Sequence, residues 1–186
     1  MGAVRITSGF LRGRRVETPP GDETRPLLTR LRKSLADILR PRLAGTSVLD
    51  LFAGSGAVAF ELLSNGAERA VAVERSGSVA RLILENAERL GVAHRIRVVR
   101  ADALRALDDL GARGERFGVV LVMPPYWKGH QGPSLNAVWQ HRVLEPGGVV
   151  VVQRHRREPV AAPPEGLVRV RTRAYGRTAF DFYEEA

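Results

Sequence analysis

Residues 47–57, SVLDLFAGSGA, constrain the fold more than any other part of the sequence. The segment begins with an apolar run that contains one acid, Asp50, and continues with residues 53–56, which have almost no side-chain bulk. This pattern predicts a buried strand, a glycine turn and a helix, with backbone N–H groups open to a ligand at the start of the helix. Such a unit is the first half of a nucleotide-binding βαβ motif.

Apolar segments of strand and helix periodicity alternate along the rest of the chain. We expect further strands at residues 69–74, 95–102, 117–123 and 149–154, and helices at residues 27–40, 58–65, 77–90, 103–110 and 134–144. The alternating segments 167–176 and 178–183 predict a terminal hairpin. The predicted fold is therefore α/β, with a doubly wound, mostly parallel, seven-stranded sheet covered by helices on both faces and the hairpin at one edge.

The positive charge of the chain is concentrated before the glycine turn. Of a net charge of +9, residues 1–45 carry +6, from ten basic and four acidic residues. We interpret these residues as a basic extension, made of a hairpin over residues 4–16 and a helix, that precedes a cofactor-binding domain at residues 46–186. The asymmetry favours a nucleic-acid surface. The alternatives are a general basic bias, since 27 of the 29 cations are arginines, and a helix whose charged face is simply solvated.

Composition excludes several classes of site. The chain has no cysteine, so disulfides and cysteine-ligated metals are excluded, and its four scattered histidines do not predict a metal site. No apolar run approaches the roughly 20 residues that span a bilayer, and the N-terminus lacks the apolar core of a signal peptide. We therefore expect a soluble, cytoplasmic protein without membrane contact, and nothing in the sequence requires more than a monomer.

Acidic side chains and one proline-rich segment follow the predicted strands. Asp50, Glu74, Asp102 and residues 123–126 all come at carboxyl ends. The carboxyl ends of parallel strands lie at the same edge of a sheet, where ligands of such folds bind. The sequence therefore predicts that these residues line one crevice.

The ligand of this crevice is suggested by the type and spacing of its acids. Gly54 and Gly56 form a degenerate dinucleotide-binding turn, and Glu74, 18 residues after Gly56, is placed to accept hydrogen bonds from a ribose. Both features also suit NAD. Asp50 could pair with an amino group that NAD lacks, and Asp102 could contact an adenine amine. The structural alternatives are a turn cap for Asp50 and a helix N-cap for Asp102.

At these residues the chain resembles the class I S-adenosylmethionine-dependent methyltransferases, which have a Rossmann-like fold. The sequence DLFAGSG at residues 50–56 is similar to their first motif, Glu74 to the ribose-binding acid, and Asp102-Ala103 to the adenine-contacting motif. Residues 123–126, Met-Pro-Pro-Tyr, are similar to the motif of enzymes that methylate the exocyclic amine of a base. The resemblance implies cofactor binding by Asp50, Phe52, Ala53, Gly54, Gly56, Glu74, Arg75, Asp102 and Ala103.

Terminal segments narrow the resemblance to the bacterial 16S rRNA guanine-N2 methyltransferase family. They are VRITSGFLRGRRV at residues 4–16, the arginines of residues 25–32, and RAYGRT at residues 173–178. The family implies S-adenosylmethionine as donor, S-adenosylhomocysteine as product, no metal, and 16S rRNA or the small ribosomal subunit as partner. It also implies a catalytic segment of Met123, Pro124, Pro125 and Tyr126, and RNA contacts by Arg5, Arg12, Arg14, Arg15, Arg25, Arg30 and Arg32.

Met123 departs from the family pattern, which has Asp or Asn at this position. There the polar side chain and a proline carbonyl accept the hydrogens of the target amine, while the aromatic residue stacks on the base. A thioether is only a weak acceptor. Three interpretations follow: activity through backbone acceptors, activity with another residue supplying the missing contact, or an RNA-binding protein with little turnover. An NAD-dependent oxidoreductase is a further alternative that the Pro-Pro-Tyr segment disfavours.

Overall fold

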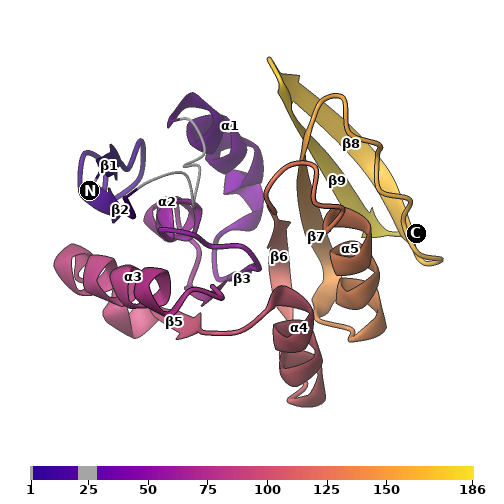
Figure 1. Ribbon diagram of the computed structural model, residues 1–186, viewed down its shortest axis with the longest axis horizontal. Coiled ribbons are helices and arrows are strands. Elements are labelled where there is room, and N and C mark those ends of the chain that lie inside the picture. Colours follow the sequence, from indigo (N-terminus) through magenta and orange to yellow (C-terminus); the bar gives the residue numbers. More distant parts are fainter. Residues whose placement is uncertain (1, 21–28) are drawn as a thin grey trace.

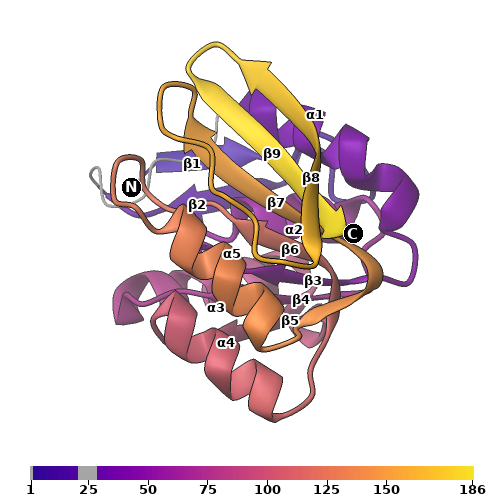
Figure 2. The same ribbon diagram turned by 90° about the vertical axis from the view of Figure 1, so that its right-hand side faces the viewer.

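A computed structural model, which describes residues 2–20 and 29–186, contains a seven-stranded sheet in the order β5-β4-β3-β6-β7-β9-β8 (Figure 1). Five of the strands are parallel: β3 (Ser47–Asp50), β4 (Arg69–Val73), β5 (Ile96–Val99), β6 (Phe117–Val122) and β7 (Leu144–His155). At the β7 edge, β9 (Thr178–Glu185) and β8 (Leu167–Tyr175) are antiparallel and lie side by side in Figure 2. The predicted parallel sheet with an edge hairpin is confirmed.

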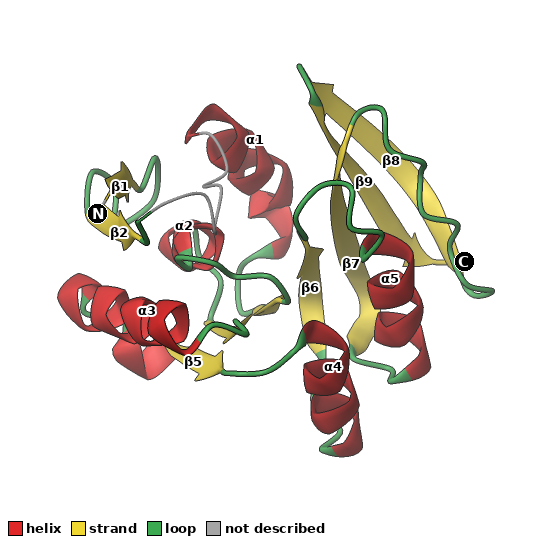
Figure 3. Cartoon of the chain, viewed as in Figure 1, coloured by secondary structure: helices red, strands yellow, loops and turns green. Residues whose placement is uncertain are grey.

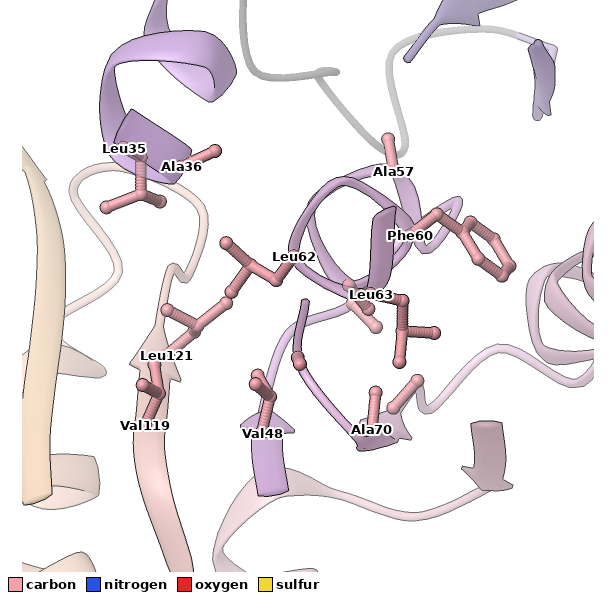
Figure 4. Packing of buried hydrophobic residues seen from close by; sticks show 14 of the residues in the cluster. Leu35, Ala36, Val48, Ala57, Phe60, Leu62, Leu63, Ala70, Val119 and Leu121 are labelled. Carbon is pink, nitrogen blue, oxygen red and sulfur yellow. The ribbon is translucent and has the colours of Figure 1, made fainter. Parts of the chain in front are cut away.

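Helices cover both faces of the sheet (Figure 3). One core contains side chains of α1 (Thr29–Leu39), α2 (Ala57–Ser64) and α3 (Gly77–Leu90), and the other contains those of α4 (Ala103–Ala112) and α5 (Gln131–Gln140). Successive strand residues belong to opposite cores, as Val48 and Leu49 do, because side chains alternate across a strand. Figure 4 shows Val48, Val119 and Leu121 of the strands facing Leu62 of α2. The central strands are therefore apolar on both faces over most of their length.

Two of the boundaries that differ from the prediction differ for one reason. Helix α5 ends at Gln140 rather than at residue 144, and β7 already begins at Leu144, where it pairs with Phe117 of β6. The register then shifts, so that Val119 pairs with Val149. Residues 146–148, Pro-Gly-Gly, form an irregularity inside the strand, with Gly147 at φ 73°. The sequence suggests a turn here, whereas the pairing of Leu144 with Phe117 extends the strand past it.

The basic extension packs against the body of the protein. Strands β1 (Gly2–Arg5) and β2 (Arg15–Thr18) form the predicted hairpin, with Val4 opposite Val16. Ile6, Leu11 and Val16 are buried in the same core as α2. The division of the chain at residue 45 stays a prediction, but the apolar contacts of the hairpin are continuous with those of residues 46–186.

A buried carboxylate fixes the hairpin on α2. The Oε1 atom of Glu61 accepts hydrogen bonds from the Thr7 hydroxyl (2.6 Å), the Thr7 amide (3.0 Å) and the Ser8 amide (3.1 Å). The Nε atom of Arg32, on α1, lies 3.8 Å from Oε2 of Glu61, and both side chains are only 1% exposed. One acid therefore connects the hairpin, α1 and α2.

The prediction that Arg32 contacts RNA is wrong. Its Nη2 atom donates to the carbonyl of Arg5 (2.8 Å), and burial lowers the pKa of its guanidinium, while Glu61 acts in the opposite direction. Arg32 precedes Leu35 by three positions and Leu39 by seven, so helical spacing places it on the face of α1 that packs inward. Arg25, another predicted contact, lies outside the described residues. Within residues 2–20 and 29–186, no helix has the length and apolar character needed to cross a membrane.

The position of Glu61 predicts a large loss of stability when its carboxylate is removed. In Glu61→Ala, the buried Arg32 loses the carboxylate that lies beside it, and Thr7 and Ser8 lose their acceptor. We expect the free energy of unfolding to fall by about 3–5 kcal/mol, measured by urea denaturation. Glu68→Ala, at an exposed position near the end of α2, is the control. A loss for Glu61→Ala no larger than for the control would show that the carboxylate does not hold these elements together.

Candidate functional site

The end of β3 leads into a turn that brings three elements together. The amide of Leu51 donates to the carbonyl of Leu121 after β3 has paired with β6, and the amide of Ala53 donates to Val73 at the end of β4, at 3.1 and 3.0 Å. Gly56 has φ 79°, and a Cβ there would lie 2.8 Å from the ring of Phe60. Glycine is therefore required at Gly56 both by its backbone conformation and by close packing.

Glu74 ties this turn to the start of α3. Its Oε2 atom accepts a hydrogen bond from the amide of Gly54 (3.1 Å), and its Oε1 atom accepts one from the amide of Ser76 (2.8 Å). The carboxylate is half-buried at the end of β4. Glu74 is therefore held rigidly beside the glycine turn, with lone pairs left for a ligand hydroxyl. Arg75, the next residue, is exposed.

Asp50 is the most perturbed acid of the site. Its side chain is 2% exposed, and its Oδ1 atom is 3.3 Å from the amide of Phe52, as in a weak turn cap. Burial raises the pKa of Asp50 to about 7, the Phe52 amide acts in the opposite direction, and the charge of Glu74 adds to the rise. A buried carboxylate with a raised pKa favours a cationic ligand, because a nearby positive charge would stabilise its ionised form.

The other predicted cofactor positions surround the same edge of the sheet. Asp102 is exposed and caps α4, its Oδ1 atom accepting from the amide of Leu104 (2.9 Å), so the structural alternative for Asp102 is confirmed. This leaves its second oxygen for a ligand. Ala53 and Ala103 are buried, and Phe52 is half-buried with its ring centroid 6.0 Å from that of His130. Their binding roles stay predictions.

The Met-Pro-Pro-Tyr segment follows β6 at this edge. Met123 is half-buried against the core that contains α2, Pro124 is buried and Pro125 is exposed. The hydroxyl of Tyr126 is 2.8 Å from Oγ1 of Thr178 and accepts a hydrogen bond from Nε2 of Gln153 (3.0 Å). Tyr126 is therefore anchored by strands β9 and β7. Sequence reasoning missed both anchors, because the register of β7 with β9 brings them to Tyr126.

Trp127 has an unusual backbone conformation that a buried acid stabilises. Its φ is 62°, which is rare for a bulky residue, and its side chain is 60% exposed. The Trp127 amide donates to Oε1 of Glu158, which also accepts from Nε2 of Gln131 (3.2 Å), while Oε2 accepts from the amide of His155 (2.6 Å). Glu158 therefore fixes the chain just after Tyr126. Sequence reasoning did not single out Trp127, although an aromatic residue directly after the Met-Pro-Pro-Tyr segment was a signal that could have identified it.

Three aromatic rings meet beside the Met-Pro-Pro-Tyr segment. The ring of His155 lies 5.7 Å from that of Tyr126 and 5.1 Å from that of Trp127, between centroids. Aromatic faces of this kind are suited to stacking with a base. Next to His155 in β7, Arg154 forms a buried ion pair with Asp181 of β9, with 2.6 Å between Nε and Oδ2, and this pair fixes β7 against β9.

Five of the predicted RNA-contacting arginines lie on the N-terminal hairpin and at the start of α1. Arg5, Arg12, Arg14, Arg15 and Arg30 are exposed. The Arg5 guanidinium donates to the carbonyl of Gly13 (2.9 Å), and Arg15 is 3.5 Å from Glu17. The structure therefore supports an accessible basic surface on the hairpin and at the start of α1. Among the described residues, no group of three or more acidic or histidine side chains could hold a metal ion.

The raised pKa of Asp50 predicts a pH-dependent loss of stability. The unfolded value is 3.8, so between about pH 4 and pH 7 the unfolded chain releases a proton that the folded chain retains. Stability is therefore lost as the pH rises through this window, by on the order of 4 kcal/mol in total. Asp50→Asn should be more resistant to urea than the native protein, and the advantage should grow from pH 5 to pH 8.

The control for this measurement is Asp109→Asn, at an exposed position on α4. A difference between Asp50→Asn and the native protein that did not change with pH would contradict the assignment of the shifted pKa to Asp50.

Comparisons with known proteins agree with this geometry. A family model described as "Conserved hypothetical protein 95" matches residues 4–184. The chain is 30% identical over 182 residues to YlbH of Bacillus subtilis, which is provisionally named as an rRNA methyltransferase. The alignment covers 98% of this chain and 99% of that protein. It is 28% identical over 183 residues to ribosomal RNA small subunit methyltransferase D of Escherichia coli, with 98% and 90% covered.

The fold comparison gives the same result. A solved structure from Escherichia coli, provisionally described as the methyltransferase yhhF, superposes with a TM-score of 0.86 at 29% identity, over 100% of this chain and 99% of that one. The match therefore includes the N-terminal hairpin and the C-terminal strands as well as the glycine turn. The chain belongs to this family of 16S rRNA methyltransferases.

Proposed function

We propose that this protein transfers a methyl group from S-adenosylmethionine to the exocyclic N2 amine of a guanine in small-subunit rRNA. The observation that carries the proposal is the meeting, at one edge of the sheet, of the glycine turn, the acids Asp50 and Glu74, and the Pro-Pro-Tyr segment. The names of the relatives, which include small-subunit rRNA methyltransferases, support the rRNA substrate. Such a substrate implies a cytoplasmic protein, and a monomer is sufficient for this site.

The acids suit the parts of the proposed cofactor. Asp50 would pair with the amino group, because a cation there offsets the cost of ionising a buried carboxylate. Glu74, already oriented by Gly54 and Ser76, would accept hydrogen bonds from the ribose hydroxyls. Asp102, with one oxygen capping α4, would offer the other to the adenine amine. Glycines 54 and 56 keep the turn free of side chains.

The chemical step places one requirement on the protein. The cofactor supplies an electrophilic methyl group on a sulfonium, and the guanine N2 lone pair forms the new C–N bond as the S–C bond breaks. The first products would be S-adenosylhomocysteine and a protonated N2-methylguanine, and loss of the extra proton to solvent would give the neutral methylated base. The protein must hold N2 close to the methyl group with its lone pair aligned. Tyr126, pinned at its hydroxyl, would stack on the base, and the Pro124 carbonyl would accept an amine hydrogen.

Gln153 is a candidate for the acceptor that Met123 does not provide. The register that pairs Val122 with Val152 places Gln153 beside the segment that follows β6. Its amide nitrogen donates to the Tyr126 hydroxyl, and within the part of the chain that the structure describes no group donates to its amide oxygen. An amide carbonyl is the group that asparagine supplies in the family pattern. We therefore propose that Gln153 accepts the second hydrogen of the target amine.

The role of Gln153 predicts a specific kinetic loss. Gln153→Leu should lower kcat for methyl transfer by about 100-fold, as for other single polar catalytic contacts, with unchanged affinity for S-adenosylmethionine. Restoring an amide from the neighbouring strand, in the double variant Met123→Asn with Gln153→Leu, should recover activity. Tyr126→Phe removes only the hydroxyl. It therefore separates the proposed hydrogen bond from the target amine to Gln153 from the anchoring of Tyr126 by Gln153. An equal loss in Tyr126→Phe would mean that Gln153 acts only through the tyrosine.

The reaction itself is tested with a labelled donor. Purified protein is incubated with S-adenosylmethionine carrying a tritiated methyl group and with small ribosomal subunits or free 16S rRNA, and the RNA is then digested to nucleosides. We expect label in N2-methylguanosine, together with cofactor binding in titration calorimetry. Cofactor binding without transfer to either substrate would favour the RNA-binding alternative, and binding of NAD instead would favour the oxidoreductase.

A further inference from the structure

An open cleft of about 760 Å³ lies at the tip of the N-terminal hairpin, away from the proposed catalytic edge. The hairpin loop, the outer side of α1, the C-terminal end of α2 and Arg95 line it. Helix α2 runs back from the glycine turn, so its C-terminal end lies at the amino ends of the strands. Its eight residues alone span about 12 Å. The cleft is therefore distinct from the crevice that holds Asp50 and Glu74.

The cleft presents one exposed aromatic ring on a rigid support. Phe10 is 60% exposed, and its amide donates to the carbonyl of Ser64 (3.0 Å). Gly9 has φ 77°, and a Cβ there would lie 1.8 Å from the Ser64 carbonyl oxygen, so the loop rests directly on the end of α2. The backbone thus fixes Phe10 where its ring cannot fold into the core.

Arg95 stabilises this ring and is itself held in place. Its guanidinium carbon lies 5.3 Å from the centroid of Phe10, in a cation–π contact. Its Nε atom donates to the carbonyl of Glu68 (3.0 Å) and its Nη2 atom to that of Ala67 (2.5 Å). An ordered aromatic ring beside a fixed cation is the arrangement on which an unpaired base stacks.

The charge around the ring suits phosphates. Arg12, Lys33 and Arg40 join Arg95 in lining the cleft. Among the residues that the structure describes, the acid that pairs with these cations is Asp37, at 2.6 Å from Lys33 and 2.7 Å from Arg40. One carboxylate shared by two cations leaves the lining positive, and the side chains of Lys33 and Arg40 remain more than half exposed.

Helix α1 connects the cleft to the proposed catalytic edge. Lys33 and Arg40 line the cleft, whereas Arg30, at the other end of the helix, reaches the β8–β9 turn, its Nη2 atom lying 3.9 Å from the position of a Cβ on Gly176. Thr178, just beyond this turn, bonds the Tyr126 hydroxyl. Figure 1 shows α1 between the hairpin and strands β8 and β9. Basic side chains of α1 therefore lie both at the cleft and beside the β8–β9 turn that Thr178 follows.

We propose that this cleft binds an unpaired nucleotide of the RNA substrate at a distance from the methylated base, stacking its base on Phe10 and placing its phosphates against Arg12, Lys33 and Arg40. The proposal rests on the proposed function for the identity of the RNA, but its support is the cleft itself, with its exposed ring and basic lining. It explains why an aromatic side chain is held in solvent at the centre of a basic surface.

The test measures binding of a fluorescein-labelled, unstructured single-stranded RNA by anisotropy, using the whole chain. Phe10→Leu keeps an apolar side chain but removes the stacking face, and should weaken binding about fivefold or more. Phe10→Trp should retain or increase affinity. Arg40→Gln should weaken binding, and the negative slope of log affinity against log salt concentration should become less steep by about one unit. The matched control is Arg113→Gln, at an exposed position after α4.

Several outcomes overturn the proposal. RNA affinity of Phe10→Leu equal to that of the native protein would do so, as would equal losses in Arg40→Gln and the Arg113 control. Polyglutamate competing as well as RNA of the same length would reassign the cleft to an acidic protein partner. Thermal unfolding of each variant separates a local effect from misfolding. The proposed function is tested independently, by tritium transfer with the native protein. Weaker RNA binding by Phe10→Leu without any methyl transfer would support the nucleotide site at the cleft and contradict the proposed reaction.

Discussion

The parallel pairing of β3 with β4 and β6 organises the centre of the sheet and the site at its edge. It places the ends of three strands at one edge, so that Asp50, Glu74 and the segment after Val122 become neighbours although 72 residues separate the first from the last. The amides that follow β3 continue this pairing, since Leu51 donates to Leu121 and Ala53 to Val73. The site is thus an extension of the hydrogen bonds of the sheet rather than a loop added to it.

Buried acids in this protein fall into two groups. Glu61, Glu158 and Asp181 are each satisfied by several hydrogen bonds or an arginine, and each fixes one element against another. Asp50 is also buried, but among residues 2–20 and 29–186 its carboxylate accepts only one long hydrogen bond, and burial raises its pKa to about 7. A buried acid with few hydrogen bonds and no nearby cation is typical of a binding site, where the ligand supplies the missing positive charge or hydrogen bonds. This contrast separates the acids that build the fold from the one that suits a cationic cofactor.

The position of Met123 shows how one substitution can leave a site largely intact. The thioether packs into the core at the end of β6, and the adjacent Tyr126 is still anchored at its hydroxyl by Thr178 and Gln153. The anchoring of Tyr126 is therefore independent of the residue at 123. In the reaction that we propose, a polar acceptor from β7 or from the backbone would replace the usual side chain at position 123.

Local sequence patterns were sufficient to predict the succession of strands and helices along the chain, the glycine turn and the acids that follow the strands. These features depend on periodicity within short segments and on the shared direction of parallel strands. The sequence also indicated the hairpin and the N-cap role open to Asp102. The tertiary structure decided the rest: Arg32 turned inward to Glu61, Gln153 reached Tyr126, and Phe10 came to lie against Arg95. These outcomes depend on side-chain packing between segments far apart in the chain, which no local pattern encodes.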